Sequence, residues 1–409
     1  MSDRLRVLVL SRAYPSDVLP TLGLWVEHPT VLLAERCDMR VVSPVPYCPP
    51  LPEVGRLREY VKFRRIPHRE TRHGIEIMRP RFVVGPGTSL YAIEHAAYLR
   101  GVVRQVDRLR TEFPFDLIHA HFIYPDGVVA HRLARRYGVP FLVTEHAPWT
   151  GWLDRWRVAP QAIPAALAAK AILAVSTSVE KTIRAYAGSG PRVEVIPVGV
   201  DGDRFRLGTG PRISDQILFV GFLNRNKGVD VLLHALKLLE ERGEPGRAVL
   251  VGGSFYRDTR VQEERLRRLA RELDLDGRVS FAGRQPQAEV ARLMAESAVV
   301  VLPSRAESFG AVLVEALACG TPVVATRSGG PEDIVTGDVG RLVPPDEPKA
   351  LAEAIQSVLA VRERFPPEEL RSYALSKFSW HTIVPRIEAE YLRAIGRMVG
   401  SSAYSCTPE

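Results

Sequence analysis

The sequence predicts an α/β protein with two doubly wound parallel sheets, one in each half of the chain. Short apolar runs alternate with segments of helical periodicity twice over, and a stretch rich in glycine and charge separates the two series. A chain of 409 residues is too long for one ordinary core and suits two domains. Because ligands of such sheets bind at the carboxyl ends of the strands, we expect the site in a cleft between the halves.

The expected strands follow the apolar runs in chain order. In the first half they fall at residues 6–11, 39–44, 75–79, 116–120, 141–144, 171–175 and 193–197. In the second half they fall at 216–220, 248–252, 279–282, 299–303 and 323–326. The boundaries follow: a first domain at 1–198 completed by a C-terminal helix at 378–409, a linker at 199–212 and a second domain at 213–377.

Segment 303–316 sets two carboxylates around an expected helix start. Glu307 stands at the mouth of a strand, and Glu315 follows about two turns into the helix. Between them, backbone N–H groups at Ser308, Phe309 and Gly310 and the positive end of the helix dipole suit a phosphate. Carboxylates accept hydrogen bonds from vicinal hydroxyls, so the order predicts a sugar, a diphosphate and a ribose. The alternative is an ordinary strand, turn and helix with two surface glutamates.

The residues downstream extend this pattern into a family signature. Segment 319–326 is a glycine helix stop followed by a buried-strand run, and segment 329–334 reads Gly-Gly-Pro-Glu-Asp-Ile. Taken together, residues 307–334 resemble the donor-site signature of the family 4 glycosyltransferases, which are retaining enzymes of the GT-B fold. The resemblance implies an N-terminal acceptor domain and a C-terminal domain that binds a nucleotide-diphosphate sugar. It is densest from 221 to 334 and weakest from 49 to 110.

The first loop of the second sheet, residues 220–230, contains Gly221, Arg225 and Lys227. A cation on such a loop can stabilise the charge of a leaving diphosphate, although a solvated loop fits the residues equally well. The resemblance implies a basic pair that grips the diphosphate. Lys227 matches its lysine, whereas Phe222 stands in place of its arginine, so Arg225 is the candidate substitute. Arg284 follows the strand at 279–282, near where the family seats its nucleotide base.

In the first half, the resemblance points to Gly23 as a neighbour of the donor phosphate and to His146 as the active-site histidine that contacts the sugar. His119 and His121 share one face of a strand, as a core pair or as lining of the cleft, and Glu145 precedes His146. These three residues are candidates for the acceptor side. The segment that starts at Phe378 is expected to cross back and pack on the first domain.

The net charge of +8 favours anionic partners. A basic stretch is formed by Arg56, Arg58, Lys62, Arg64, Arg65, Arg69, Arg72, Arg79 and Arg81. Without a helix-turn-helix, zinc-finger or RNP pattern, this stretch does not indicate nucleic acid. It fits a solvated face, an anionic lipid headgroup or a phosphorylated acceptor. We therefore expect a cytoplasmic protein, with peripheral binding at the inner face of the cell membrane as the further prediction.

The sequence predicts no metal site, no disulfide framework and no cofactor other than the nucleotide sugar as co-substrate. Its four cysteines, Cys37, Cys48, Cys319 and Cys406, lie far apart. The pair Asp201 and Asp203 has the D-x-D form that binds Mn²⁺ in the other main glycosyltransferase fold, but here it falls in the linker.

The sequence therefore predicts a retaining, metal-independent glycosyltransferase, expected to transfer a hexose in polysaccharide biosynthesis, with His146, Glu307 and Lys227 at the reaction. Its acceptor is a glycan, a lipid-linked molecule or a small molecule. The alternatives are an inactive sugar-nucleotide binding protein, or a phosphorylase or epimerase of the same fold. The sugar, the base, the acceptor and the oligomeric state do not follow from the residues.

Overall fold

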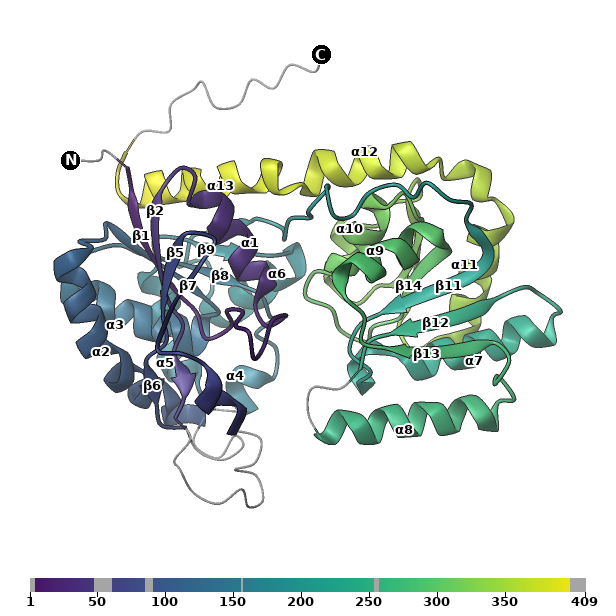
Figure 1. Ribbon diagram of the computed structural model, residues 1–409, viewed down its shortest axis with the longest axis horizontal. Helices are drawn as coiled ribbons and strands as arrows, with labels where there is room; N and C mark the ends of the chain where they lie inside the picture. The colour runs from purple at the N-terminus through teal and green to yellow at the C-terminus, as the bar shows by residue number, and fades with distance from the viewer. Residues whose placement is uncertain (1–3, 48–60, 85–90, 156, 254–256, 398–409) are drawn as a thin grey trace, which may run out of the picture. The chain divides into compact units, whose positions relative to one another are not determined.

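The chain divides into two compact units, residues 1–197 with 383–409, and residues 198–382. In this computed structural model, the residues described are 4–47, 61–84, 91–155, 157–253 and 257–397 (Figure 1). Among them, no helix is both long and apolar enough to cross a membrane. Arg56, Arg58, Cys48 and Cys406 lie outside the described residues.

The first unit is built on an eight-stranded sheet in the order β10-β9-β8-β7-β1-β2-β5-β4, beside a two-stranded sheet of β3 and β6. Buried Val, Ile and Leu side chains of β1, β7 and β8 form the centre of its core. The strands are β1 (Arg6–Leu10), β2 (Asp38–Val42), β3 (Val45–Pro46), β4 (Arg69–Arg72), β5 (Ile75–Met78), β6 (Arg81–Phe82), β7 (Leu117–His121), β8 (Phe141–Glu145), β9 (Ile172–Ala174) and β10 (Val193–Val195). The helices are α1 (Leu24–Leu33), α2 (Glu94–Glu112), α3 (Val128–Tyr137), α4 (Trp152–Arg155), α5 (Ala159–Ala168) and α6 (Thr177–Ala187), with the short turns η2 (Tyr91–Ile93) and η3 (Ile123–Gly127).

The second unit holds a six-stranded sheet in the order β13-β12-β11-β14-β15-β16, parallel throughout. Helix α7 packs on α8 and α11, whereas α10 packs on α9 and α12 (Figure 1). The strands are β11 (Ile213–Val220), β12 (Arg247–Val251), β13 (Val279–Gly283), β14 (Ser297–Leu302), β15 (Val323–Thr326) and β16 (Gly340–Val343). The helices are α7 (Val229–Glu241), α8 (Arg257–Glu272), α9 (Gln287–Glu296), α10 (Ala311–Ala318), α11 (Pro348–Ala360) and α12 (Pro367–Phe378), with η4 (Arg225–Lys227), η5 (Gly330–Asp333) and η6 (Arg362–Arg364).

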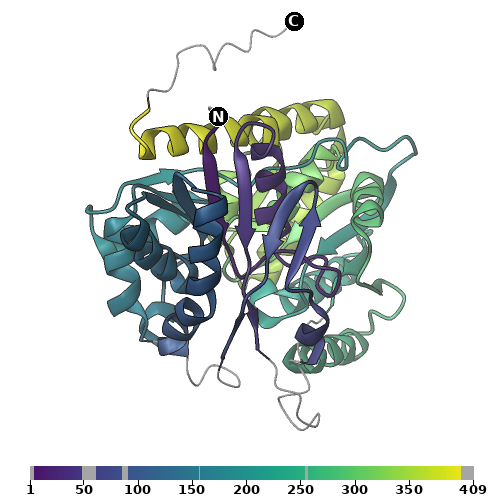
Figure 2. The ribbon, with the colours of Figure 1, turned by 60° about the vertical axis from the view of Figure 1, so that its left-hand side comes forward.

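The expected parallel strands are present in both units, with one departure from the parallel rule. Strand β4 pairs antiparallel with β5 at the edge of the first sheet (Figure 2). Its sequence, Arg-Glu-Thr-Arg, lacks the apolar run that marks the other strands, and none of its residues is buried. Strands β3, β6 and β16 were also not predicted, because they are too short or too mixed to give a periodic signal.

The expected linker, residues 199–212, belongs to the second unit. Val200 N–H donates to the carbonyl of Phe378 over 2.7 Å, and Arg371 donates to the carbonyls of Gly202 and Phe205 over 2.8 and 2.7 Å. The Asp201 carboxylate caps its own turn by accepting the N–H groups of Asp203 and Arg204, each over 3.1 Å. The D-x-D pair therefore shapes a turn in this segment.

The last helix, α13 (Trp380–Ala394), joins the first unit from Ile383 onward. The Tyr391 hydroxyl lies 2.7 Å from Nδ1 of His119, and Glu390 pairs with Arg192. Arg386 donates to the carbonyl of Val195 over 2.6 Å. These contacts place α13 on the first unit from Ile383 onward, whereas residues 378–382 belong to the second unit.

Three arginines of the basic stretch, Arg69, Arg72 and Arg79, are paired with carboxylates in the folded protein. Arg72 bonds Glu27 over 2.8 Å and Asp17 over 3.3 Å, and Arg69 lies 3.6 Å from Glu76. Arg79 is 1% exposed and pairs with Glu70 across the β4–β5 hairpin. These partners are separated from the arginines by up to 55 residues, so the sequence made the stretch look more positive than the folded surface is.

Glu70→Ala is predicted to destabilise the first unit by about 3–5 kcal/mol, because it leaves the buried Arg79 guanidinium without its carboxylate. Glu76→Ala on the same hairpin serves as the matched control, since its partly exposed pairs with Arg40 and Arg69 are expected to contribute only about 0–1 kcal/mol. Urea unfolding of the two variants beside the wild type measures the difference. Equal losses would show that the burial of Arg79 carries no special cost.

Candidate functional site

Glu307 is fixed in space by its backbone. Its N–H donates to the carbonyl of Ser328 over 2.9 Å, and its carbonyl accepts the N–H of Gly330 over 2.8 Å. The loop after β14 is thereby joined to the loop after β15. In the carboxylate, Oε2 accepts the Ser304 hydroxyl over 3.1 Å and the Lys227 ammonium over 2.5 Å. Oε1 accepts no hydrogen bond from the described residues, which leaves it available to a ligand hydroxyl.

Lys227 reaches Glu307 because two strand-end loops touch. The Asn224 side chain accepts the backbone N–H of Lys227 over 3.1 Å, which fixes the turn η4. Gly228 follows with φ of 64°, and a Cβ there would lie 1.9 Å from the carbonyl oxygen of Pro303. Only glycine permits this backbone contact, so the loop after β11 packs against the loop after β14.

The helix start predicted between the carboxylates is confirmed at Gly310, with φ of 96°, and α10 runs from Ala311. No side chain caps the helix, so its first N–H groups are available to an anion. The Phe309 ring is buried against Phe378, with 5.9 Å between the ring centroids. The side chain of Phe309 therefore belongs to the core, and only its backbone is a candidate for contact with a ligand. Ser308 is half-buried beside it.

Glu315 lies one turn into α10, not two, because the helix begins four residues before it. The side chain is half-buried and has no hydrogen-bond partner among the described residues. Burial raises its pKa to about 7, which the nearby Arg204 partly opposes. A carboxylate in this state gains from a ligand that donates hydroxyl groups to it.

Of the remaining donor-side candidates, Gly221 is tightly placed and the two arginines are exposed. The loop after β11 passes the end of β12 so closely that a Cβ at Gly252 would lie 1.8 Å from the Gly221 carbonyl oxygen. The side chains of Arg225 and Arg284 both reach solvent. The structure brings Lys227, Glu307 and the start of α10 together. The side chains of Arg225 and Arg284 are exposed and do not join this cluster through any described contact.

Arg305 is a residue that the sequence did not single out. It donates to Asp230 over 3.0 and 2.8 Å, to Asp346 over 2.6 Å and to the carbonyl of Arg225. Through these contacts it ties the loop after β14 to the start of α7. No local pattern marks it, because its partners lie 75 and 41 residues away.

At the carboxyl edge of the first sheet, His146 lies in a cluster of rings. Its Nε2 is 2.9 Å from Nδ1 of His121, so one imidazole donates to the other. The rings of Phe122 and Trp25 lie 5.0 and 6.2 Å from the His146 ring. Burial lowers the pKa of His146 to about 3 and also lowers that of His121, with the neighbouring histidines adding to the effect. Both imidazoles are therefore neutral at neutral pH.

Two of the three acceptor-side candidates are fully occupied inside the protein. His119 bonds the hydroxyls of Tyr391 and Thr144, each over 2.7 Å. Glu145 is 0% exposed and accepts from Trp149 Nε1 and from the backbone N–H groups of 123, 146 and 147, over 2.9–3.1 Å. A side chain enclosed in this way positions its neighbours. His119 and Glu145 therefore support His146, in place of the contact with an acceptor that the sequence predicted for them.

Gly23 caps α1 with φ of 80°, and a Cβ there would lie 2.1 Å from the carbonyl oxygen of Ala13. The two ends of the loop between β1 and α1 therefore touch each other through backbone. Helix α1 carries Trp25 beside His146, so this loop and the histidine share one edge of the sheet.

A second cluster at this edge was missed from the sequence. Arg12, just after β1, pairs with Glu94 and lies 3.7 Å from Asp126, whose carboxylate also accepts the Tyr98 hydroxyl over 2.9 Å. Burial raises the pKa of Asp126 to about 7, against the opposing effect of Arg12.

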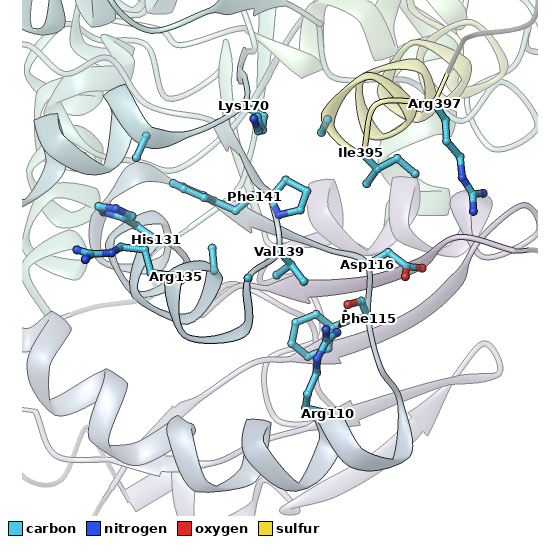
Figure 3. Close-up of a pocket in the computed structure, with 15 residues that line it drawn as sticks. Arg110, Phe115, Asp116, His131, Arg135, Val139, Phe141, Lys170, Ile395 and Arg397 are labelled. Atoms are coloured by element: carbon cyan, nitrogen blue, oxygen red, sulfur yellow. Dashed lines mark hydrogen bonds between the residues drawn. The ribbon is translucent and has the colours of Figure 1, made fainter.

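A cavity of the first unit lies elsewhere, at the amino-terminal ends of β7 and β8. It has a volume of about 730 Å³, and Figure 3 shows Asp116 and Phe141 at its wall with Arg110, Arg135, Lys170 and Arg397 around it. The clustered candidate residues His121 and His146 stand at the opposite ends of these strands. Within the described ranges, no three His, Cys, Asp or Glu side chains gather to hold a metal ion.

Comparison with known proteins decides the family. Residues 211–374 match the model of the glycosyl transferases group 1, and residues 32–204 match that of glycosyltransferase family 4. A D-inositol 3-phosphate glycosyltransferase from Xylanimonas cellulosilytica is 34% identical over 64% of this chain and 68% of its own length. The chain belongs to the group 1 glycosyltransferases.

Further relatives agree with this membership. The D-inositol 3-phosphate glycosyltransferase of Frankia alni is 35% identical over 60% of this chain, and the match spans 66% of that relative, just under two thirds of its length. Sucrose-phosphate synthase from Thermosynechococcus elongatus superposes with a TM-score of 0.80 at 22% identity, over 96% of this chain and 100% of that one. Anabaena HepE in complex with UDP and glucose gives 0.73 at 21%, with the same coverage. This group 1 glycosyltransferase therefore has the GT-B fold that the signature predicted.

Glu315→Gln is predicted to raise the melting temperature relative to the wild type, and by more at pH 8 than at pH 5. The pKa of glutamate in an unfolded chain is about 4.3. In the folded protein, burial raises the pKa of Glu315 to about 7. Between these values the folded protein holds the extra proton, so the wild type loses stability as the pH rises through this window. Thermal melts across pH 5–8 measure the effect.

Glu264→Gln, at an exposed position of α8, is the control and should show no change in this difference with pH. A Glu315→Gln melting difference that stays constant with pH would contradict the raised pKa.

Proposed function

We propose that this protein transfers a hexose from a nucleotide-diphosphate sugar to an acceptor, with retention of the anomeric configuration and without a metal ion. The observation that carries the proposal is the placement of Lys227, Glu307 and the uncapped start of α10 at one strand edge, with Glu315 one turn further. The relatives named D-inositol 3-phosphate glycosyltransferase and the HepE complexes with UDP support a nucleotide-sugar donor.

In this proposal, the cationic groups act on the leaving diphosphate. Lys227 has three N–H donors and spends one on Glu307, so two remain for phosphate oxygens. The N–H groups at the start of α10 add the positive end of the helix dipole. Both are already in place before the reaction, which is the condition for stabilising charge that develops in the transition state.

The glutamates are assigned to the neutral parts of the donor. Oε1 of Glu307 is available for a sugar hydroxyl, while Oε2 accepts from Lys227 beside the phosphate site. Glu315 is assigned to the ribose hydroxyls, which would satisfy its half-buried carboxylate. His146, neutral and braced by His121, is assigned to the transferred sugar.

The acceptor is proposed to carry an anionic group, and its source to be a glycan or lipid-linked molecule used in polysaccharide biosynthesis. Two observations support this: the relatives named for a phosphorylated acceptor, and the surplus of basic residues in the first unit. Cytoplasmic placement with binding at the inner face of the membrane is part of the same proposal, since anionic leaflets attract basic segments.

Lys227→Ala is predicted to lower turnover about a hundredfold or more, because it removes a stabiliser of transition-state charge. Arg225→Ala is expected to lower turnover as well if Arg225 supplies the contact that Phe222 cannot make. Lys237→Ala on α7 is the control, since among the described residues that lysine pairs with Glu240 one turn along its own helix. Steady-state rates with UDP-, GDP- and ADP-sugars measure these effects. Unchanged turnover in Lys227→Ala would overturn the assignment of the diphosphate to this loop.

Transfer is predicted to continue in excess EDTA. The Asp201 carboxylate is used to cap its own turn, and the charge of the leaving group is assigned to Lys227 and the α10 start. Measuring the rate before and after dialysis against EDTA provides the check. A loss of activity that Mn²⁺ or Mg²⁺ restores would show that a metal ion carries the phosphate charge instead.

A further inference from the structure

An apolar groove of about 570 Å³ lies in the first unit between the β3–β6 pair and the amino-terminal half of α2. Tyr47, Val83 and Ile93 stand at its rim and are 49%, 66% and 59% exposed. Phe82 and Ala97 line its interior. Large apolar side chains gathered around a hollow are uncommon on a soluble surface without a ligand or partner.

The walls of the groove are held by rigid elements. A Cβ at Gly101 of α2 would lie 2.6 Å from the carbonyl oxygen of Arg81 and 2.7 Å from Cβ of Phe82, so the helix and β6 touch through backbone. The Phe82 ring packs on Tyr98, with centroids 5.3 Å apart, and the Tyr98 hydroxyl donates to Asp126 over 2.9 Å. The groove is therefore formed before any ligand arrives.

The charge in the groove is positive and incompletely compensated. Arg81 donates from Nη2 to the carbonyl of Ile66, whereas its Nη1 is buried and has no hydrogen-bond partner among the described residues. Arg100, exposed at the wall, has no described carboxylate at ion-pair distance. The acidic residue of the groove, Glu94, is paired with Arg12. A buried donor without a partner is costly, and an anion would satisfy it.

The groove opens at the same sheet edge as His146. Strands β1, β2, β5, β7 and β8 are parallel, and β3 and β6 follow directly after β2 and β5. The Tyr124 hydroxyl donates to the carbonyl of Tyr91, at the start of the turn η2 that carries Ile93. Two residues before Tyr124, the Phe122 ring lies 5.0 Å from that of His146.

We propose that this groove binds the hydrocarbon chain of a lipid-linked acceptor, with the phosphate of that acceptor on Arg81 and Arg100. The inference rests on the proposed function and names the class of its acceptor. A small soluble acceptor would leave the apolar rim unexplained, and an uncharged lipid would leave the unpartnered Arg81 N–H unexplained. An anionic amphiphile satisfies both features at once.

Binding of short alkyl phosphates to the full chain tests the groove without any donor present. Calorimetry with octyl phosphate, butyl phosphate, inorganic phosphate and octyltrimethylammonium, all below micelle-forming concentrations, separates the two features. Octyl phosphate is expected to bind at least tenfold more tightly than butyl phosphate, since each buried methylene contributes about fourfold in affinity. The cationic amphiphile is expected not to bind. Equal affinity for octyl phosphate and inorganic phosphate would overturn the proposal.

Variants locate the binding. Val83→Glu, Ile93→Glu and Arg100→Glu change exposed side chains and are each expected to weaken octyl phosphate binding at least tenfold with an unchanged melting temperature. Leu167→Glu is the matched control, because Leu167 is an exposed apolar residue of α5 in the same unit, outside the groove. A control that weakens binding as much as the groove variants would refute the location, and Arg100→Glu keeps the test decisive if an apolar variant fails to fold.

Two further measurements separate this inference from the proposed function. Flotation with phosphatidylcholine vesicles that contain farnesyl phosphate is expected for the wild type and lost in Ile93→Glu, whereas recovery only with phosphatidylglycerol vesicles would indicate a general anionic surface and contradict the groove. Nucleotide binding by calorimetry reports the second unit alone. A wild-type protein that binds nucleotide but not octyl phosphate refutes the groove, and one that binds octyl phosphate but no nucleotide refutes the donor site.

Discussion

The backbone contact between Gly228 and Pro303 is the constraint on which the donor-side cluster depends. It closes the loop after β11 on the loop after β14, and a side chain at position 228 would leave no room for it. The ion pair of Lys227 with Glu307 follows from this contact, because the two residues stand 80 positions apart in the chain. Arg305 strengthens the same junction through Asp230 and Asp346. Packing of the two loops thus positions Lys227 and Glu307 without any ligand.

In the first unit, burial determines the protonation state of the residues at the carboxyl edge of the sheet. The neutral imidazoles of His119, His121 and His146 lie next to one another, the His146 ring is near those of Phe122 and Trp25, and Glu145 accepts four N–H groups. A histidine whose pKa is lowered to about 3 cannot act as a cation at neutral pH. It can still accept or donate one hydrogen bond in a fixed direction, which suits a role in orienting a hydroxyl.

The basic stretch shows how pairing changes the meaning of charge. On the β4–β5 hairpin, arginines that look like a binding face in the sequence are held by Glu27, Glu70 and Glu76. Arg81 and Arg100 line an apolar groove, and Arg100 is exposed there. The acceptor site proposed here therefore combines apolar contact with a small number of charges, in place of a broad electrostatic surface.

The sequence by itself determined the two-sheet α/β plan, the helix start between Glu307 and Glu315, and the family. These features depend on local properties, namely the periodicity of strands and helices and the spacing of glycines and carboxylates from 307 to 334. Local properties can be recognised in the sequence without a structure. Tertiary structure alone decided which candidates face solvent and which are enclosed. His119 and Glu145 are enclosed by partners brought in by folding, Tyr391 and Trp149 among them, and the Arg79–Glu70 pair depends on an edge strand with no apolar signal. Partners brought together by folding leave no periodic mark, because their spacing along the chain is set by the loops between them.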